Sequence, residues 1–231
     1  MHRLKKLIAA VLLTVLMATL AVPAFAASST QVEAAAVTTQ GSKKKIVLIG
    51  DSRTASLREV RTGKLIYDLF QQDGSILWDF KWGAKFTDMT TNLVPRLETS
   101  NFDAVDPNTT IVVWMGYNDA CGVPAASAGE YVNYYNLMTA LWTLRGAKVY
   151  IVNVGPAGCK PNQTAKDKLD AKARNKKIRA FNNTLKEGLS DQATYLDLYR
   201  YLVDYGYSTV DNTHYLPATN KVVYRYIMNR V

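Results

Sequence analysis

One serine and one histidine of this chain could together carry out nucleophilic chemistry. Ser52 lies in the polar segment Gly50–Thr54, directly after the apolar run Ile46–Ile49. A serine hydroxyl becomes a nucleophile at neutral pH when a base within hydrogen-bond reach takes its proton, and imidazole is well suited to that transfer. The chain has two histidines, and one of them, His2, lies in an N-terminal segment that we expect to be removed. His214 is therefore the candidate base for Ser52.

The sequence contains too few potential ligands for a metal site. The chain contains two cysteines, Cys121 and Cys159, and a single histidine beyond the N-terminal segment. A zinc site needs three or four closely spaced ligands, and one pair of cysteines without histidines does not supply them. We therefore predict no metal and no other cofactor.

The elements that must position these residues alternate between strands and helices. Four short apolar runs predict strands, and the first three are continuous and rich in β-branched residues, as in parallel strands that are covered on both faces. The runs are Ile46–Ile49, Ile111–Met115, Val149–Val152 and Tyr195–Leu198. Helical patterns lie between them, most clearly over Gly129–Leu144, Leu169–Leu189 and Ala218–Met228.

A fifth run, Ile76–Trp82, alternates in character. Every second residue from Ile76 to Trp82 is large and apolar, whereas Asp79 and Lys81 fall on the other side, which is typical of an edge strand with one wetter face. Strands that alternate with helices imply right-handed βαβ units and an α/β fold. We predict a three-layer α/β/α sandwich with a five-stranded parallel sheet, in the flavodoxin-like order 2-1-3-4-5, with Ile76–Trp82 at the edge.

Polar segments follow these strands at the end of the sheet where α/β proteins bind ligands. Gly50–Thr54 follows the first strand, Gly83 follows the edge strand Ile76–Trp82, and Gly116–Asp119 follows the third strand along the chain, Ile111–Met115. Asp211–His214 stands between the last strand and the last helix. Each segment alone is a weak signal, because Ser52 could be only a helix N-cap and Asn118 only a turn residue. Taken in order, they resemble the four blocks of the SGNH (GDSL) hydrolase superfamily, and the resemblance spans about residues 45–231.

The resemblance implies a serine esterase that works through an acyl-enzyme and needs no cofactor. In it Ser52 is the nucleophile, His214 is the base, and Asp211 holds the imidazole in the right tautomer. The backbone N–H groups of Ser52 and Gly83 and the side-chain amide of Asn118 form the oxyanion hole. The family includes lipases, thioesterases and carbohydrate O-acetyl esterases. Because no long apolar segment suggests a lipase lid, we expect small acyl groups, such as O-acetyl groups on a polysaccharide.

The first block departs from the family at one position. Arg53 stands where leucine is usual, and its guanidinium could pair with an anionic group of the substrate or with a carboxylate of the fold. Three aromatic residues lie next to the predicted site residues and are expected as substrate contacts: Trp82, Tyr117 and Tyr215.

The N-terminus predicts export. Residues 1–26 combine a basic start, a short apolar middle and an Ala-x-Ala end, as in a secretory signal peptide. The alternative, a membrane anchor, would need an uninterrupted apolar run of about 20 residues, and this run is shorter. Residues 27–44 read as a flexible linker, and the hydrolase domain is predicted over 45–231. We expect a protein that is secreted or associated with the cell wall, without a stable membrane span.

The charge of the chain favours an anionic neighbourhood. The formal charge is +9, and removal of residues 1–26 takes away three basic residues and no acid, which leaves about +6. The sequence shows no nucleic-acid module, and the basic run from Lys166 to Arg179 reads as the solvated face of a helix.

The alternative function is a non-catalytic wall- or glycan-binding module on the same fold. A nucleotide binder would need a Gly-rich phosphate loop after the first strand, and Gly50–Thr54 is not one.

The two cysteines predict a disulfide beside the site. Cys121 follows the third strand and Cys159 follows its expected neighbour, so their loops leave the same end of the sheet about one strand spacing apart. An exported chain meets conditions in which such a bridge persists. The alternative is two free thiols, since the loops could diverge.

Overall fold

The computed structural model describes residues 44–99, 105–158 and 160–231. The expected signal peptide and all of the expected linker except Lys44 lie outside the described residues. The first strand, β1 (Lys45–Gly50), begins at the residue where the sequence predicts that the domain starts.

The core of the fold is a sheet of six strands within the described residues, in the order β2-β3-β1-β4-β5-β6. The strands are β1, β2 (Asp68–Asp73), β3 (Ile76–Lys81), β4 (Thr109–Trp114), β5 (Lys148–Val152) and β6 (Ala193–Leu196). Five of them run parallel, in the order 2-1-3-4-5 when β3 is counted as the second, as predicted. The predicted number of five is wrong because β2 adds an antiparallel strand outside β3.

The extra strand also corrects the prediction for Ile76–Trp82. This run is not the edge, because β2 pairs along the whole of β3 through a tight turn at Gly74, whose φ is +62°. Asp79 on its supposedly wetter side is fully buried. Arg96 reaches Asp79 with an N–O distance of 2.6 Å and also bonds to Asp68 of β2. Burial nevertheless raises the pKa of the Asp79 carboxyl to about 7.

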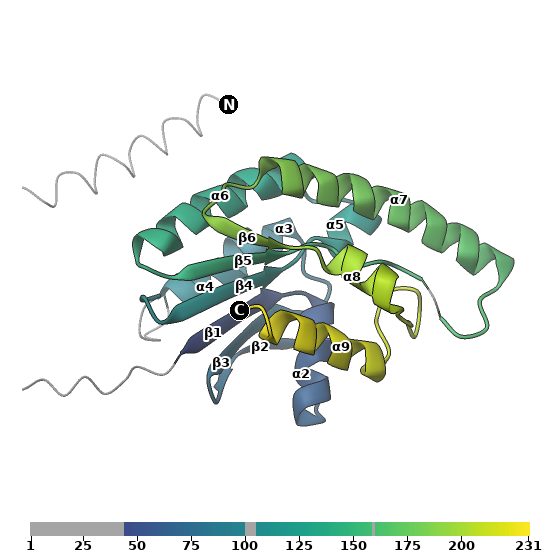
Figure 1. Ribbon diagram of the computed structural model, residues 1–231, viewed down its shortest axis with the longest axis horizontal. Coiled ribbons are helices and arrows are strands. Elements are labelled where there is room, and N and C mark those ends of the chain that lie inside the picture. Colours follow the sequence, from purple (N-terminus) through teal and green to yellow (C-terminus); the bar gives the residue numbers. More distant parts are fainter. Residues whose placement is uncertain (1–43, 100–104, 159) are drawn as a thin grey trace, which may run out of the picture. The chain divides into compact units, whose positions relative to one another are not determined.

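Helices cover both faces of the sheet, so the predicted three-layer sandwich is confirmed (Figure 1). One face carries α2 (Ser52–Thr62), α8 (Leu198–Tyr205) and α9 (Pro217–Met228). The other carries α3 (Phe86–Asp88), the π-helical turn η1 (Met89–Leu93), α4 (Val94–Thr99), α6 (Ala128–Leu144) and α7 (Ala165–Gly188). Successive residues of β1 alternate between the two layers: Val47 and Ile49 pack on the α6–α7 side, and Leu48 packs on the α2–α9 side.

The predicted strand Tyr195–Leu198 ends earlier than expected. β6 stops at Leu196, and the side chain of Asp197 accepts a hydrogen bond from the backbone N–H of Arg200, which caps α8. Leu198 therefore belongs to a helix. Within the described ranges, no helix has both the length and the apolar character needed to cross a membrane.

Candidate active site

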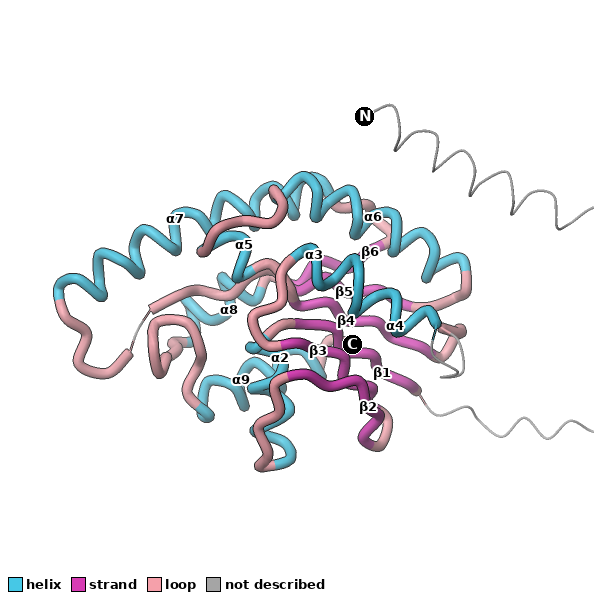
Figure 2. The backbone as a smooth tube through the Cα atoms, turned by 180° about the vertical axis from the view of Figure 1, so that it is seen from behind, coloured by secondary structure: helices cyan, strands magenta, loops and turns pink. Residues whose placement is uncertain are grey.

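Three segments of the predicted site start side by side at the carboxyl edge of the sheet. Gly50, the last residue of β1, is level with Phe80 of β3 and with Trp114 of β4. The segments that leave these strands carry Ser52, Gly83 and Asn118. Figure 2 views the molecule from behind, and in it α2 and α5 (Tyr117–Cys121) begin at this end of the sheet. The register of the strands alone therefore brings these three residues to the same edge of the sheet.

Ser52 is the first residue of α2 and lies almost entirely inside the protein, at 4% exposure. The side chain of Asp51 caps the helix by accepting a hydrogen bond from the N–H of Arg53 at 2.9 Å. Burial raises the pKa of this carboxyl to about 6. The serine therefore stands at a helix N-terminus, where unpaired N–H groups and the helix dipole favour negative charge.

Asp211, His214 and Ser52 form a continuous hydrogen-bonded chain. Nε2 of His214 lies 3.1 Å from Oγ of Ser52, and Nδ1 lies 2.8 Å from Oδ2 of Asp211. The other oxygen of Asp211 accepts the N–H groups of Thr213 and His214, at 2.9 and 2.7 Å. Partial burial acts to raise the pKa of Asp211, but these hydrogen bonds outweigh it and hold that pKa below its usual value. The carboxylate thus stays ionised and fixes the ring of His214.

An aromatic pair supports the imidazole on one side. The ring of Trp82 stacks on His214 with centroids 4.7 Å apart and an interplanar angle of 24°. The exposed Tyr67 meets Trp82 edge to face at 5.2 Å. Trp82, predicted as a substrate contact, is half-buried and is in direct contact with the candidate base. Tyr67 was not singled out from the sequence, because its proximity depends on the path of the segment before β2.

The segment after Gly83 is tied to Asn118 and Asp119. Gly83 is exposed and adopts a φ of +71°, which favours glycine. The amide of Asn118 donates to the carbonyl of Ala84 at 2.9 Å, and the carboxylate of Asp119 accepts the N–H of Phe86 at 2.9 Å. The carboxylate of Asp119 also accepts a hydrogen bond from Tyr131 at 2.6 Å. These bonds set the position of Gly83 relative to Asn118, a role for Asp119 and Tyr131 that sequence reasoning missed.

Arg53 and its two aromatic neighbours lie in the interior. Arg53 and Tyr215 are each 2% exposed and Tyr117 is 5% exposed. The guanidinium carbon lies 3.7 Å from the ring centre of Tyr117 and 4.7 Å from that of Tyr215. Their surfaces are largely buried against one another, and the expected contacts of these three side chains with substrate stay a prediction. The guanidinium donates to main-chain carbonyls and, among the described residues, to no carboxylate, while its pairing with an anionic substrate group stays a prediction.

The predicted disulfide involves one described cysteine. Cys121 is half-buried at the end of α5 and forms no disulfide with a described residue, and burial raises the pKa of its thiol. Cys159 lies outside the described residues, so the bridge stays a prediction. Within the described ranges, no cluster of histidine, cysteine and carboxylate side chains is arranged to hold a metal ion.

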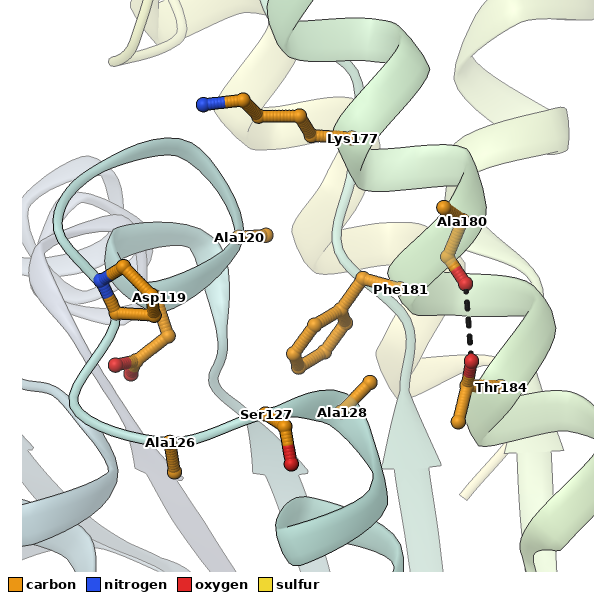
Figure 3. Close-up of a pocket in the computed structure, with 10 residues that line it drawn as sticks. Asp119, Ala120, Ala126, Ser127, Ala128, Lys177, Ala180, Phe181 and Thr184 are labelled. Atoms are coloured by element: carbon orange, nitrogen blue, oxygen red, sulfur yellow. Dashed lines mark hydrogen bonds between the residues drawn. The ribbon is translucent and has the colours of Figure 1, made fainter.

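A shallow pocket of about 330 Å³ opens next to Asp119 (Figure 3). Phe181 and Ala180 of α7 form one wall, and Ala120 and Ala126 from the segment around Asp119 form the other. Lys177 stands at its rim. The lining includes Asp119, the neighbour of Asn118 in the chain, but neither Ser52 nor His214.

A sequence model of one protein family matches almost the entire described chain. The family is GDSL-like Lipase/Acylhydrolase, and the match runs over residues 46–227. A search of curated protein sequences gives no significant match.

Solved structures share the fold at low sequence identity. A protein of Bacteroides fragilis assigned as an acylhydrolase is 17% identical, with a TM-score of 0.58 over 82% of this chain and 87% of that one. A lipase/acylhydrolase from Enterococcus faecalis is 14% identical, with a TM-score of 0.52 over 81% and 94%. A variant of an acetyl-xylooligosaccharide esterase from Geobacillus is 12% identical, with a TM-score of 0.54 over 80% and 93%. At these identities the likeness shows the fold.

Proposed function

This chain belongs to the GDSL-like lipase/acylhydrolase family and is a hydrolase, and we propose that it is a secreted serine esterase with Ser52 as its nucleophile. The observation that carries the proposal is the hydrogen-bonded chain from Asp211 through His214 to Ser52, with distances of 2.8 and 3.1 Å. A serine held against an imidazole that is itself held by a carboxylate is the arrangement needed to activate a hydroxyl.

The reaction follows from the direction of these hydrogen bonds. With Nδ1–H donated to Asp211, the lone pair of Nε2 of His214 faces the hydroxyl of Ser52 and takes its proton. Oγ then attacks the ester carbonyl carbon, and the C=O electron pair moves onto oxygen. As the tetrahedral intermediate collapses, His214 gives its proton to the departing alcohol oxygen, and the acyl group remains on Ser52. Water, deprotonated by His214, attacks the acyl-enzyme and releases the acid, and the proton returns to Ser52.

The developing oxyanion would be held by three donors. The N–H of Ser52 has no hydrogen-bond partner within α2, because Ser52 is the first residue of that helix. The N–H of Gly83 follows β3 at the same edge of the sheet. The side-chain amide of Asn118 has two hydrogens, and Ala84 takes one of them. The second is available to the substrate, and a preorganised donor of this kind contributes about 10²–10³ in rate.

We further propose O-acetyl groups on a carbohydrate as the substrate class. Half of the Asp211 side chain, 52%, is exposed, so the base side of the site is open to a bulky polymeric alcohol. Trp82 borders this opening through its stack on His214. The Geobacillus protein of the same fold is an esterase for acetylated xylo-oligosaccharides, which supports the idea. The N-terminal residues 1–26 support action outside the cell or at its wall.

Labelling with a fluorophosphonate tests the nucleophile directly. Intact-mass analysis should show one adduct on the wild-type protein and none on Ser52→Ala. Ser56→Ala is the matched control, because it removes a hydroxyl one turn further along α2 that donates to the Ser52 carbonyl, and it should label like wild type. Hydrolysis of p-nitrophenyl acetate through long-chain p-nitrophenyl esters then measures the acyl pocket. Absence of labelling and turnover in folded wild-type protein would favour the glycan-binding module instead.

A further inference from the structure

Arg53 joins the nucleophile helix to two other segments of the site. Its Nη1 donates to the carbonyl of Gly155 at 2.9 Å, and its Nη2 reaches the carbonyl of Pro156 at 3.3 Å. On the other side, Nε and Nη2 both donate to the carbonyl of Thr213, at 3.2 and 2.9 Å. Arg53 directly follows Ser52, and Thr213 directly precedes His214. The guanidinium therefore links the two residues that flank the reacting pair.

The surroundings of the guanidinium are built for a buried cation. Within the described residues, all of its hydrogen bonds end on main-chain carbonyls or on the hydroxyl of Tyr215. The rings of Tyr117 and Tyr215 pack against it. A buried charge is tolerated when its hydrogen-bonding groups are satisfied, and this one is satisfied without a carboxylate partner among them. A leucine at this position could make none of these bonds.

The segment that carries His214 is held to the rest of the fold at several points, through Gly158, Asp167 and Arg174 among others. Arg53 provides the hydrogen bonds that run from this segment to the helix of Ser52. The bonds between Asp211 and His214 are internal to residues 211–214, so they orient the imidazole within the segment but do not fix the segment relative to Ser52. The segment is partly exposed, at 52% for the Asp211 side chain and 21% for that of His214, and Asn212 within it adopts a φ of +67°. Asn212 itself is buried, whereas the side chains of Asp211 and His214 are not, so burial fixes the segment only in part.

The other end of the tether is firmly held. The side chain of Asn182 on α7 bonds to both the N–H and the carbonyl of Val154, and Asn175 does the same for Ala157. Gly155 and Pro156 lie between these two clamps. Their carbonyls thus give Arg53 a fixed point, and the N-terminus of α2 gives it a second.

We propose that Arg53 is a positioning residue that sets the distance between Oγ of Ser52 and Nε2 of His214. It acts through the Thr213 carbonyl and touches no reacting atom. The inference rests on the proposed function, because it assigns Arg53 a part in the Ser52–His214 proton transfer.

The test is the kinetics of Arg53→Leu and Arg53→Lys. Leucine removes the tether, and lysine keeps the charge but replaces the planar fork with one point donor. A displacement of about 1 Å in a reacting pair can lower a rate about 10²-fold. We expect Arg53→Leu to lose about 10²-fold in kcat with KM changed less than about threefold, and Arg53→Lys to recover part of the loss. The rate constant for fluorophosphonate inactivation should fall in parallel, because it also depends on activation of Ser52.

Arg96 supplies the matched control. Its guanidinium also bridges several segments by hydrogen bonds, but at the β2–β3 edge. Arg96→Leu should lower the melting temperature and leave kcat unchanged below it. An Arg53→Lys protein that melts early but keeps wild-type kcat would overturn the proposal, as would a rise in KM alone. If Arg53→Leu does not fold, Arg53→Lys decides the question. Activity that survives Ser52→Ala would refute the proposed function itself, independently of Arg53.

Discussion

Replacing Gly50 with alanine tests how closely the position of Ser52 depends on the packing of β1 against α2. A Cβ built on Gly50 would lie 1.8 Å from Oγ1 and 2.5 Å from Cβ of Thr54, and 3.0 Å from the carbonyl oxygen of Trp114. Rotation of the Thr54 side chain could relieve the first contact. It cannot relieve the second, because Cβ is fixed to the backbone. The first turn of α2 must therefore move.

The size of the effect follows from these distances. Restoring an ordinary contact of about 3.4 Å between the two Cβ atoms requires a backbone shift of about 0.9 Å. Ser52 lies two residues before Thr54 in the same turn and moves with it. We expect kcat to fall about 10²-fold and the free energy of unfolding to fall by about 1–3 kcal/mol, as for other overpacked sites.

The assay combines p-nitrophenyl acetate kinetics with urea unfolding followed by circular dichroism. Adding Thr54→Gly to Gly50→Ala removes both close Thr54 atoms and should restore much of kcat, whereas Thr54→Gly alone should mainly cost helix stability. Gly129→Ala in α6 is the control, since its new Cβ would meet only Oγ of Ser127 at 3.9 Å. Full activity in folded Gly50→Ala would refute the idea that this packing positions the nucleophile.

Three further predictions concern the oxyanion donor, the helix cap and the cysteines. Asn118→Ala should lower kcat about 10²–10³-fold with little change in KM; a loss confined to affinity would assign Asn118 to binding instead. The pKa of Asp51 is about 6 in the folded protein against 3.8 as its ordinary value, so its protonation favours folding below pH 3.8 and this stability is lost as pH rises through 6. Asp51→Asn keeps an acceptor for the N–H of Arg53 but does not titrate. Between pH 4 and 7 the unfolding free energy of the wild type should therefore fall by up to about 3 kcal/mol more than that of the variant. Parallel pH profiles from urea titrations would contradict this. Cys121 and Cys159 should resist alkylation without reductant in protein exported by its natural route, and two modified thiols by intact mass would exclude the disulfide.

Part of the fold can be predicted from short stretches of the sequence. The parallel strands are continuous apolar runs whose order along the chain, alternating with helical patterns, restricts the topology to a doubly wound sheet. The strand β2 escaped prediction because its sequence, Asp-Leu-Phe-Gln-Gln-Asp, is polar and only half-buried. Its place in the sheet comes from pairing with β3 and from the hydrogen bonds of Arg96, which joins it from a helix more than twenty residues away.

The candidate triad is equally accessible from the sequence. With one histidine beyond the N-terminal segment, there was a single candidate for the base, and the polar segments after each strand indicated the edge of the sheet where Ser52 and Asn118 would meet. The structure added the distances and the aromatic stack of Trp82 on His214.

The sequence by itself determined which residues could react and at which end of the sheet they would gather, because residue type and strand order are local properties of the chain. Only the tertiary structure decided the surroundings of Arg53, Tyr117 and Tyr215. Whether a guanidinium faces a substrate or the interior depends on carbonyls contributed by Gly155 and Thr213, about 100 and 160 positions further along the chain. Such contacts leave no periodic pattern in the sequence, since main-chain carbonyls are present at every residue and only the folded chain brings particular ones together.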